Sequence, residues 1–226
     1  MQFFSRLHRS TLAGIYISAA CVAYLITTYH LPNDKGLGAM LFSFGIFAVT
    51  YCDLDLFTSR LALLVTRPPD ELLKTPMYLF NIWFGNYLGC FISAVIIRKT
   101  RYADFLKDTC KMISDKHLAD SPAGLFVAGV GCTLMLYMAI RMYNEHSQTV
   151  YGMVTLVAAS VAFICAGFEH TIAVGFYMIL GRYTFPERIS VLLPIALGNT
   201  IGALIPAAIL ERTKRDEYSN NTGEDH

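Results

Sequence analysis

Charged residues are scarce in this 226-residue chain. Asp, Glu, Lys and Arg make up 15% of it, whereas soluble domains usually carry about 25%. Hydrophobic residues account for 54%, and the mean hydropathy is +0.45. The formal net charge is only +1, which gives no reason to expect a nucleic-acid partner. The shortage of charge indicates a protein whose solvent is lipid.

Metal-binding and catalytic motifs are also missing. The cysteines have no CxxC spacing and five of the six lie in apolar stretches, so we expect buried thiols rather than a disulfide framework or a zinc site. There is no HExxH or GxSxG motif, and no second histidine lies in the apolar runs beside His170. The sequence therefore predicts no enzyme, no cofactor and no metal.

Apolar runs that can each cross the hydrocarbon, which takes roughly 20 residues, recur six times. The basic start of the chain leads into the first run, which is too long for a signal peptide and lacks a small-residue cleavage site. The second and fifth runs are interrupted by charged residues. The expected spans are 11–29, 36–52 continuing as 56–66, 76–97, 122–140, 151–168 continuing as 171–181, and 189–210.

The two interruptions belong to a pattern that occurs twice. Asp55 follows the second run, and Asn86 stands 31 positions later in a G-N-x-x-G element. Glu169 follows the fifth run, and Asn199 stands 30 positions later in another G-N-x-x-G element. Because each half has three spans, the second half must enter the membrane upside down relative to the first. The sequence thus predicts an all-α membrane protein with six transmembrane helices in an inverted 3+3 repeat, the second and fifth broken.

The whole chain is expected to form one transmembrane domain. The connector between the halves has the spacing of a short amphipathic helix on the surface, either simply solvated or a weakly positive vestibule that concentrates anions. Lys and Arg divide almost evenly between the two sets of loops, so charge leaves the orientation open. The expected parts are an N-terminus (1–10), a first repeat (11–98), the connector (99–121), a second repeat (122–210) and a polar, mobile tail (211–226).

The two breaks indicate where function resides. Non-helical backbone at membrane depth is tolerated only where protein or water covers it. Breaks related by pseudo-symmetry would meet near the midplane and form a binding site or pore. The N-termini of the half-helices carry partial positive charge, which favours an anion.

Several elements resemble the formate/nitrite transporter family: GFEHTIA (167–173), DLFTS (55–59) and the two G-N-x-x-G elements. The resemblance covers nearly the whole chain. It implies an aquaporin-like protomer in a homopentamer, with one substrate path through each protomer and both termini on the cytoplasmic side of the inner or plasma membrane. It also implies small monovalent anions such as formate, nitrite or hydrosulfide as substrates.

The resemblance assigns a substrate pathway. His170 is similar to the family's central pore histidine, and Thr58 to the threonine on the opposite broken-helix loop. Leu56 and Phe57 match loop positions of an apolar constriction, and we count Phe168 with them. An anion is costly to place in an apolar passage, so His170 and Thr58 would supply hydrogen-bond donors, and a protonated His170 could also pass the anion a proton.

The polar surroundings include one departure from the family. Thr133 stands where members commonly have an asparagine, and a hydroxyl has one donor where an amide has two. Glu169 would oppose anion entry if it faced the pore, so we expect it to turn away and bond backbone or a cation such as Lys116, a match to the family's vestibule lysine. Asp55 would do the same in the first half. The expected supporting network is Glu169, Asn199, Lys116, Asp55 and Asn86.

Other classes of protein stay open at this point. A channel for neutral solutes would suit the architecture, but there is no Asn-Pro-Ala repeat. A membrane enzyme using Glu169 and His170 lacks the rest of a catalytic constellation. Asn86 and Asn199 would also serve as packing contacts between small residues in a purely structural membrane protein.

Overall fold

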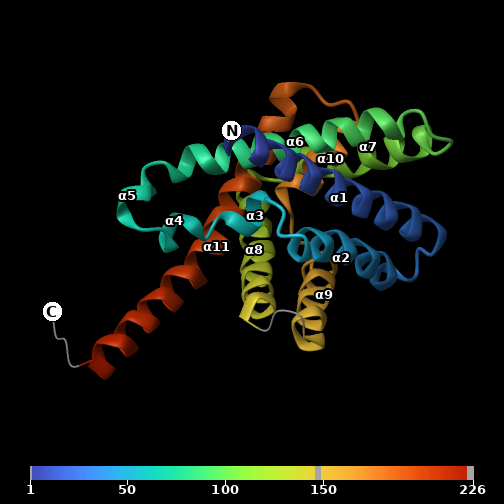
Figure 1. The fold of residues 1–226 in the computed structure, drawn as a ribbon. Coiled ribbons are helices and arrows are strands. Elements are labelled where there is room, and N and C mark those ends of the chain that lie inside the picture. The colour runs from blue at the N-terminus through green and yellow to red at the C-terminus, as the bar shows by residue number, and fades with distance from the viewer. Residues whose placement is uncertain (1, 146–148, 223–226) are drawn as a thin grey trace.

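The computed structural model describes residues 2–145 and 149–222, and in that part of the chain every regular element is a helix (Figure 1). The prediction of an all-α protein is confirmed. The helices are α1 (Gln2–His30), α2 (Lys35–Tyr51), α3 (Phe57–Arg60), α4 (Leu63–Thr66), α5 (Pro69–Leu72), α6 (Thr75–Ile97), α7 (Ala103–Ala119), α8 (Pro122–Glu145), α9 (Val150–Cys165), α10 (Thr171–Leu180) and α11 (Phe185–Thr222).

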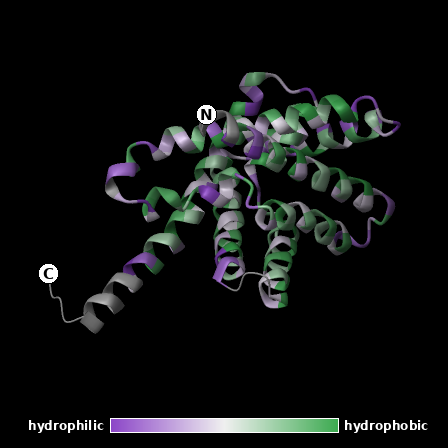
Figure 2. Cartoon of the chain, in the orientation of Figure 1, coloured by the Kyte–Doolittle hydropathy of each residue, from purple (hydrophilic) through white to green (hydrophobic). Residues whose placement is uncertain are grey.

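Within the described residues, α1, α6, α8 and α11 are long and apolar enough to cross a membrane. The segments α2, α3 with α4, α9 and α10 are apolar but shorter. Apolar residues extend along most of these helices, whereas polar residues gather at turns and helix ends (Figure 2). Length and composition thus agree with a multi-pass membrane protein.

Two helix ends differ from the expectation. The stretch predicted as an N-terminus, 1–10, belongs to α1 from Gln2 onward. The stretch predicted as a mobile tail continues α11 as far as Thr222, and 223–226 lie outside the described residues. Sequence hydropathy missed this extension because 211–222 is polar, yet it contains no glycine or proline that would end a helix.

The cysteines also need one correction. Four of the six are buried, as expected, but Cys52 and Cys165 are exposed at the ends of α2 and α9. All six are free thiols.

The interruptions after α2 and α9 have the same backbone. Asp53 and Gly167 each adopt a left-handed φ, 47° and 73°. The residue after each donates its N–H to the carbonyl five positions earlier, at 2.9 Å and 3.0 Å. This is the Schellman closure of a helix C-terminus, which favours glycine but tolerates aspartate. Each break is therefore a built turn with its own hydrogen bonds.

Helix α10 lies at the centre of the molecule. All ten of its residues are buried, and it packs against α6, α7, α11 and α1. Around it, α1 pairs with α6, α8 pairs with α11, and α2 packs beside α9 (Figure 1). The break that precedes α10 is thereby enclosed by helices from both halves of the chain.

Glycines allow the long helices to cross at backbone distance. A methyl group on Gly89 of α6 would overlap the carbonyl oxygen of Thr11 in α1. A methyl group on Gly198 of α11 would likewise overlap the carbonyl oxygen of Phe126 in α8. Each glycine belongs to one of the two G-N-x-x-G elements, so these elements form the closest helix contacts in both halves.

Replacing either glycine should destabilise the protein. In Gly89→Ala and Gly198→Ala the helices must separate, which should cost about 1–3 kcal/mol and lower both the thermal midpoint and the yield of monodisperse protein in detergent. Gly36→Ala is the matched control, because a methyl group there would meet its nearest neighbour at 3.6 Å. Unchanged midpoints in the two test variants would contradict the close crossing.

Helix α7 packs against α10 through one face. Its buried residues are Leu106, Cys110, Ser114 and His117. Met112 lies outside that face and is 56% exposed. The phenol of Tyr183, just beyond α10, shares its one hydrogen between the Asp115 carboxylate and the Lys111 carbonyl, whose oxygen lies 2.9 Å away.

The Tyr183–Asp115 hydrogen bond should make α7 docking sensitive to acid. That bond lowers the pKa of Asp115, helped by Lys111. The lowered pKa means that the contribution is complete above the unfolded value of about 3.9 and is lost as the pH falls through the folded pKa. The difference in thermal midpoint between the native protein and Tyr183→Phe should therefore shrink from about pH 7 to about pH 3. Tyr51→Phe, at an exposed tyrosine, is the control; a difference that does not change with pH would contradict the assignment.

Candidate functional site

The two broken regions meet in a single side-chain contact. Thr58 Oγ1 lies 2.9 Å from His170 Nε2, and both residues are buried. Thr58 is in the first turn of α3, whereas His170 is the N-cap of α10. The backbone N–H of Ala173 donates to His170 Nδ1 at 3.4 Å. In a neutral imidazole the proton then sits on Nε2 and points to Thr58, which leaves the hydroxyl hydrogen of Thr58 free for a third group.

A cavity opens on each side of this contact. The first, about 370 Å³, is lined by His170 together with charged side chains of the connector and the break. The second, about 340 Å³, is lined by Thr58 together with residues of α8 and α11. We call them the His170 cavity and the Thr58 cavity. Because His170 lines one and Thr58 lines the other, the 2.9 Å contact stands between them.

Asn199 holds the backbone on both sides of His170. Its Oδ1 accepts from the N–H of Thr171 at 3.1 Å, and its Nδ2 donates to the carbonyl of Glu169 at 3.0 Å. The second hydrogen of Nδ2 goes to the Gly129 carbonyl in α8 at 2.8 Å. Two of these three bonds hold the residues on either side of His170, and the third ties Asn199 to α8, so Asn199 fixes the position of the histidine.

Asn86 does the same for the first break. Its Oδ1 accepts from the N–H of Phe57 at 2.9 Å, and its Nδ2 donates to the carbonyl of Asp55 at 2.9 Å. Its other bond goes to the Ser10 carbonyl in α1 at 2.8 Å. Leu56, between the two held residues, thus occupies the place that His170 occupies in the second break.

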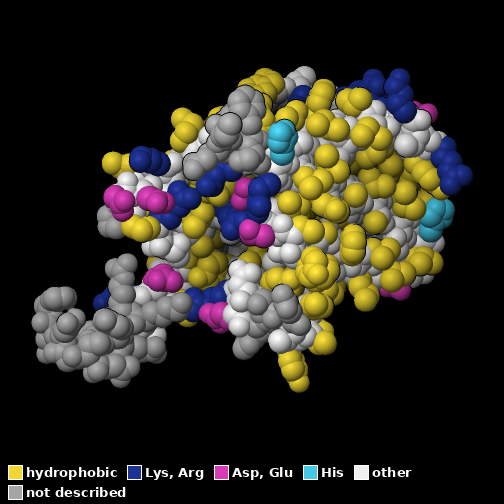
Figure 3. Space-filling model, in the orientation of Figure 1, with side chains coloured by type: hydrophobic (Ala, Val, Ile, Leu, Met, Phe, Trp, Pro, Cys, Tyr) yellow, Lys and Arg dark blue, Asp and Glu magenta, His cyan; other side chains and the backbone are white. Residues whose placement is uncertain are grey.

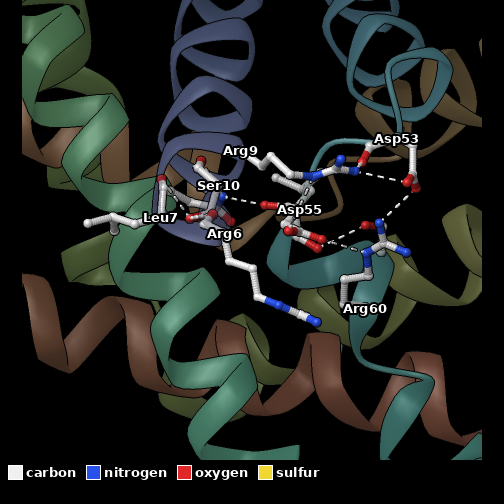
Figure 4. A network of polar contacts seen from close by, with 10 residues as sticks. Arg6, Leu7, Arg9, Ser10, Asp53, Asp55 and Arg60 are labelled. Carbon is white, nitrogen blue, oxygen red and sulfur yellow. Dashed lines mark hydrogen bonds and ion pairs between the residues drawn. The ribbon is translucent and has the colours of Figure 1, made fainter. Parts of the chain in front are cut away.

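Asp55 is bound by arginines from two helices (Figure 4). Its carboxylate lies 3.1 Å from Arg60 Nε and 3.6 Å from Arg9 Nε, although its side chain is only 6% exposed. The same arginines bind Asp53, at 2.8 Å and 2.9 Å. The expectation that Asp55 steadies its loop agrees with these contacts. They also give Arg60 a role that the sequence did not reveal: it ties α3 to the preceding break.

Glu169 lines the His170 cavity and binds a different partner from the one suggested by the sequence. Its Oε1 lies 2.8 Å from His117 Nε2, so the cation suggested from the sequence, Lys116, is one residue from the actual contact. Lys116 still lines the His170 cavity, beside His117 and Glu169. His117 was missed because it lies outside the apolar runs. The signal available was its place on the buried face of α7, seven positions after Cys110.

The remaining residues of the predicted pathway lie in different parts of the structure. Phe168 lines the His170 cavity, and Leu56 is 1% exposed at the first break. Phe57 lines a separate apolar groove between α3, α6 and α11. The hydroxyl of Thr133 donates to the Asn199 carbonyl at 2.6 Å, so it joins α8 to α11 and is directed to backbone rather than to the imidazole.

The arrangement can present hydrogen-bond donors to a small ligand but has no metal centre. In the described chain no group of three His, Cys, Asp or Glu side chains is placed to hold a metal ion. The free donor is the Thr58 hydroxyl, and the His170 Nε2–H beside it is available to a ligand that replaces its contact with Thr58. Such a point favours an anion that can shed its water.

The fold and the site define a multi-pass membrane protein with two cavities that one buried side-chain contact separates. A family model described as formate/nitrite transporter matches residues 1–212. The chain belongs to the formate/nitrite transporter family.

Curated relatives and solved structures are similar along most of the chain. The formate channel FocA of Haemophilus influenzae is 26% identical over 236 residues, which cover 88% of this chain and 83% of the relative. FocA of Escherichia coli K12 is 22% identical over 227 residues, which cover 84% and 79%.

Among solved structures, a pentameric formate channel with formate bound has a TM-score of 0.81 at 22% identity, covering 95% of this chain and 98% of that one. An ion channel of the same family has a TM-score of 0.80 at 18% identity, covering 93% and 90%. At these identities the likeness establishes the fold.

Removing the amide donors of Asn199 should destabilise the second break. In Asn199→Asp a carboxylate would face the carbonyl oxygens of Glu169 and Gly129, and we expect a loss of roughly 3 kcal/mol or more, because buried polar groups lose their partners. Thermal unfolding in detergent measures the effect. Asn33→Asp, at an exposed turn residue, is the isosteric control. If both variants unfold at the native temperature, the anchoring role is wrong.

Proposed function

We propose that this protein is a transmembrane channel or transporter for small monovalent anions of weak acids, with formate first and nitrite or hydrosulfide next. The observation that carries the proposal is the Thr58–His170 contact, a pair of polar side chains buried between two cavities. The curated relatives are formate channels, which supports transport rather than catalysis.

The proposed architecture is a single transmembrane domain with six spans in an inverted 3+3 repeat, aquaporin-like, made of a first repeat (11–98), a connector (99–121) and a second repeat (122–210). The second span would consist of α2 with α3 and α4, and the fifth of α9 with α10. The support is the repeated hydrogen bonding: in each half a left-handed turn ends the helix, and one asparagine binds the residues on both sides of the N-cap. Inverted repeats bring such breaks together near the midplane.

At the proposed pore centre His170 and Thr58 act together on the anion. An anion that leaves water for an apolar passage loses several kcal/mol of solvation, and the Nε2–H and hydroxyl donors replace part of it. His170 is the one titratable group in this contact, so it can also pass a proton to the anion and let it cross as a neutral acid. Leu56 and Phe168 complete the proposed pathway around this point, whereas Phe57, in its separate groove, and Thr133, bound to the Asn199 carbonyl, would support it from outside.

The supporting groups would bind the carboxylates that lie beside the path. His117 would hold the Glu169 carboxylate aside, and Arg9 and Arg60 would hold Asp55 aside. Lys116, in the His170 cavity, would attract the anion to that entrance. Asn86 and Asn199 would act through the backbone they bind.

The proposed assembly is a homopentamer in the inner or plasma membrane, with both termini cytoplasmic and one pathway in each protomer. The solved relative described as a pentameric formate channel supports this assembly. Protons are proposed as a second transported species.

Flux through liposomes tests the proposal. The purified protein should carry formate, nitrite or hydrosulfide but not glycerol, and faster at about pH 5 than at about pH 7.5 because protonation assists passage. In His170→Asn, formate flux should fall roughly 10- to 100-fold, because the imidazole proton is lost, and its dependence on pH should flatten. His30→Asn, at an exposed histidine, is the matched control. Glycerol flux without anion flux would instead make the protein a neutral-solute channel, and native flux in His170→Asn would remove the histidine from the pathway.

A further inference from the structure

A third cavity, of about 730 Å³, lies apart from the proposed pathway. The first turns of α1, the turn between α4 and α5, and the start of α6 surround it. Its charged lining consists of Arg6, Arg67, Lys74 and Glu71. With three cations and one acid, the lining carries an excess of positive charge. Lys and Arg side chains gather on this side of the molecule, between the N-terminal end and α5 (Figure 3).

The cations of this cavity converge on one aromatic ring. The guanidinium of Arg6 lies 4.8 Å and that of Arg67 4.5 Å from the ring centroid of Tyr78. Two like charges against the same ring repel each other, and an anion bridging them would relieve that repulsion. Planar guanidinium groups with a neighbouring ammonium are the donors that a phosphate accepts best.

The carboxylates nearby leave most of this charge uncompensated. Glu71 reaches Arg67 at 3.7 Å, but among the described residues Arg6 and Lys74 form no ion pair. Asp53 and Asp55 are already bound by Arg9 and Arg60, and in Figure 4 no interaction line joins the Arg6 guanidinium to them. The cavity is therefore a cationic site with room for an added anion.

The rim of the cavity is apolar and exposed. Leu73 and Met77, which line it, are 93% and 65% exposed, and Phe80 on the next turn of α6 is 55% exposed. On a membrane-spanning helix such side chains face acyl chains. Tyr78 marks the level at which aromatic side chains meet headgroups. A free phosphate would make no contact with this apolar rim, whereas a phospholipid would occupy both the cationic cavity and the rim.

We infer that this cavity binds the phosphate of an anionic phospholipid, with Arg6, Arg67 and Lys74 on the headgroup and Met77 and Phe80 along an acyl chain. Basic pockets between membrane helices bind lipid headgroups through the same combination. The inference involves none of the pore residues. Its failure would leave the formate flux predicted above unchanged, and the failure of that flux would leave this site unchanged.

Trp83, the one tryptophan of the chain, is a built-in reporter for the site. Its ring lies 6.2 Å from the ring of Phe80 on the rim. The full-length protein would be reconstituted in phosphatidylcholine bilayers with increasing fractions of brominated phosphatidylglycerol, and separately of brominated phosphatidylcholine. Bromine on the acyl chains quenches indole fluorescence at short range. We expect phosphatidylglycerol to quench at lower mole fractions than phosphatidylcholine.

Variants that remove positive charge test whether this cavity causes the preference for phosphatidylglycerol. In Arg6→Gln with Lys74→Gln the preference for phosphatidylglycerol should fall about 5-fold for each cation removed, and each single variant should give an intermediate value. Lys35→Gln with Lys99→Gln removes equal charge elsewhere and should keep the preference, as should the charge-preserving Arg6→Lys with Lys74→Arg. Native elution and formate flux establish that each variant is folded.

Three outcomes would overturn the inference. Equal quenching by the two lipids in the native protein would mean that no headgroup is selected. An undiminished preference in the Arg6→Gln, Lys74→Gln protein would place the lipid elsewhere. Loss of the preference on adding millimolar inorganic phosphate at constant ionic strength would make the ligand free phosphate rather than lipid.

Discussion

The interaction on which the rest of this structure depends is the one between a buried asparagine amide and an interrupted helix. A helix that stops inside a membrane leaves N–H and C=O groups without partners, and each unpaired group costs several kcal/mol in lipid. Here Asn86 and Asn199 accept from one residue and donate to another across each break. Because this satisfies the backbone, the chain can place a non-helical N-cap with a buried side chain at each break.

The two halves use this scaffold for different purposes. The N-cap of α3 is Leu56 and that of α10 is His170, so one break presents an apolar side chain and the other an imidazole. The acid before each N-cap is bound differently, by Arg9 and Arg60 in the first half and by His117 in the second. A repeated frame thereby gives an asymmetric centre, with charge held in the walls and a single titratable ring at the contact between the cavities.

Sequence patterns predicted those parts of the molecule that depend on local composition. Apolar runs located the membrane helices, and the doubled acid and G-N-x-x-G pattern pointed to the residues that build both breaks. Contacts between segments far apart in the chain could not be predicted from these patterns. The partner of Glu169 is His117 rather than Lys116, because the register of α7 on α10 decides which residue reaches the break. The hydrogen bond from Thr133 to the Asn199 carbonyl depends on how closely α8 and α11 cross. The polar end of α11 is helical although its hydropathy gives no sign of it.

The double hold of each asparagine also limits how such a pathway can open. Asn199 sits in the middle of α11 and Asn86 in the middle of α6, and each amide joins its own helix to the break and to a further helix at the same time. A half-helix that swung away would break both hydrogen bonds between the asparagine and its break, so hinge motion at the breaks is disfavoured. What can move at little cost is a side-chain torsion: a rotation of Thr58 changes the width between the cavities, whereas the His170 ring is held by the Ala173 N–H. Passage along the proposed pathway would thus depend on rotamers, on the timescale of side chains rather than of domains.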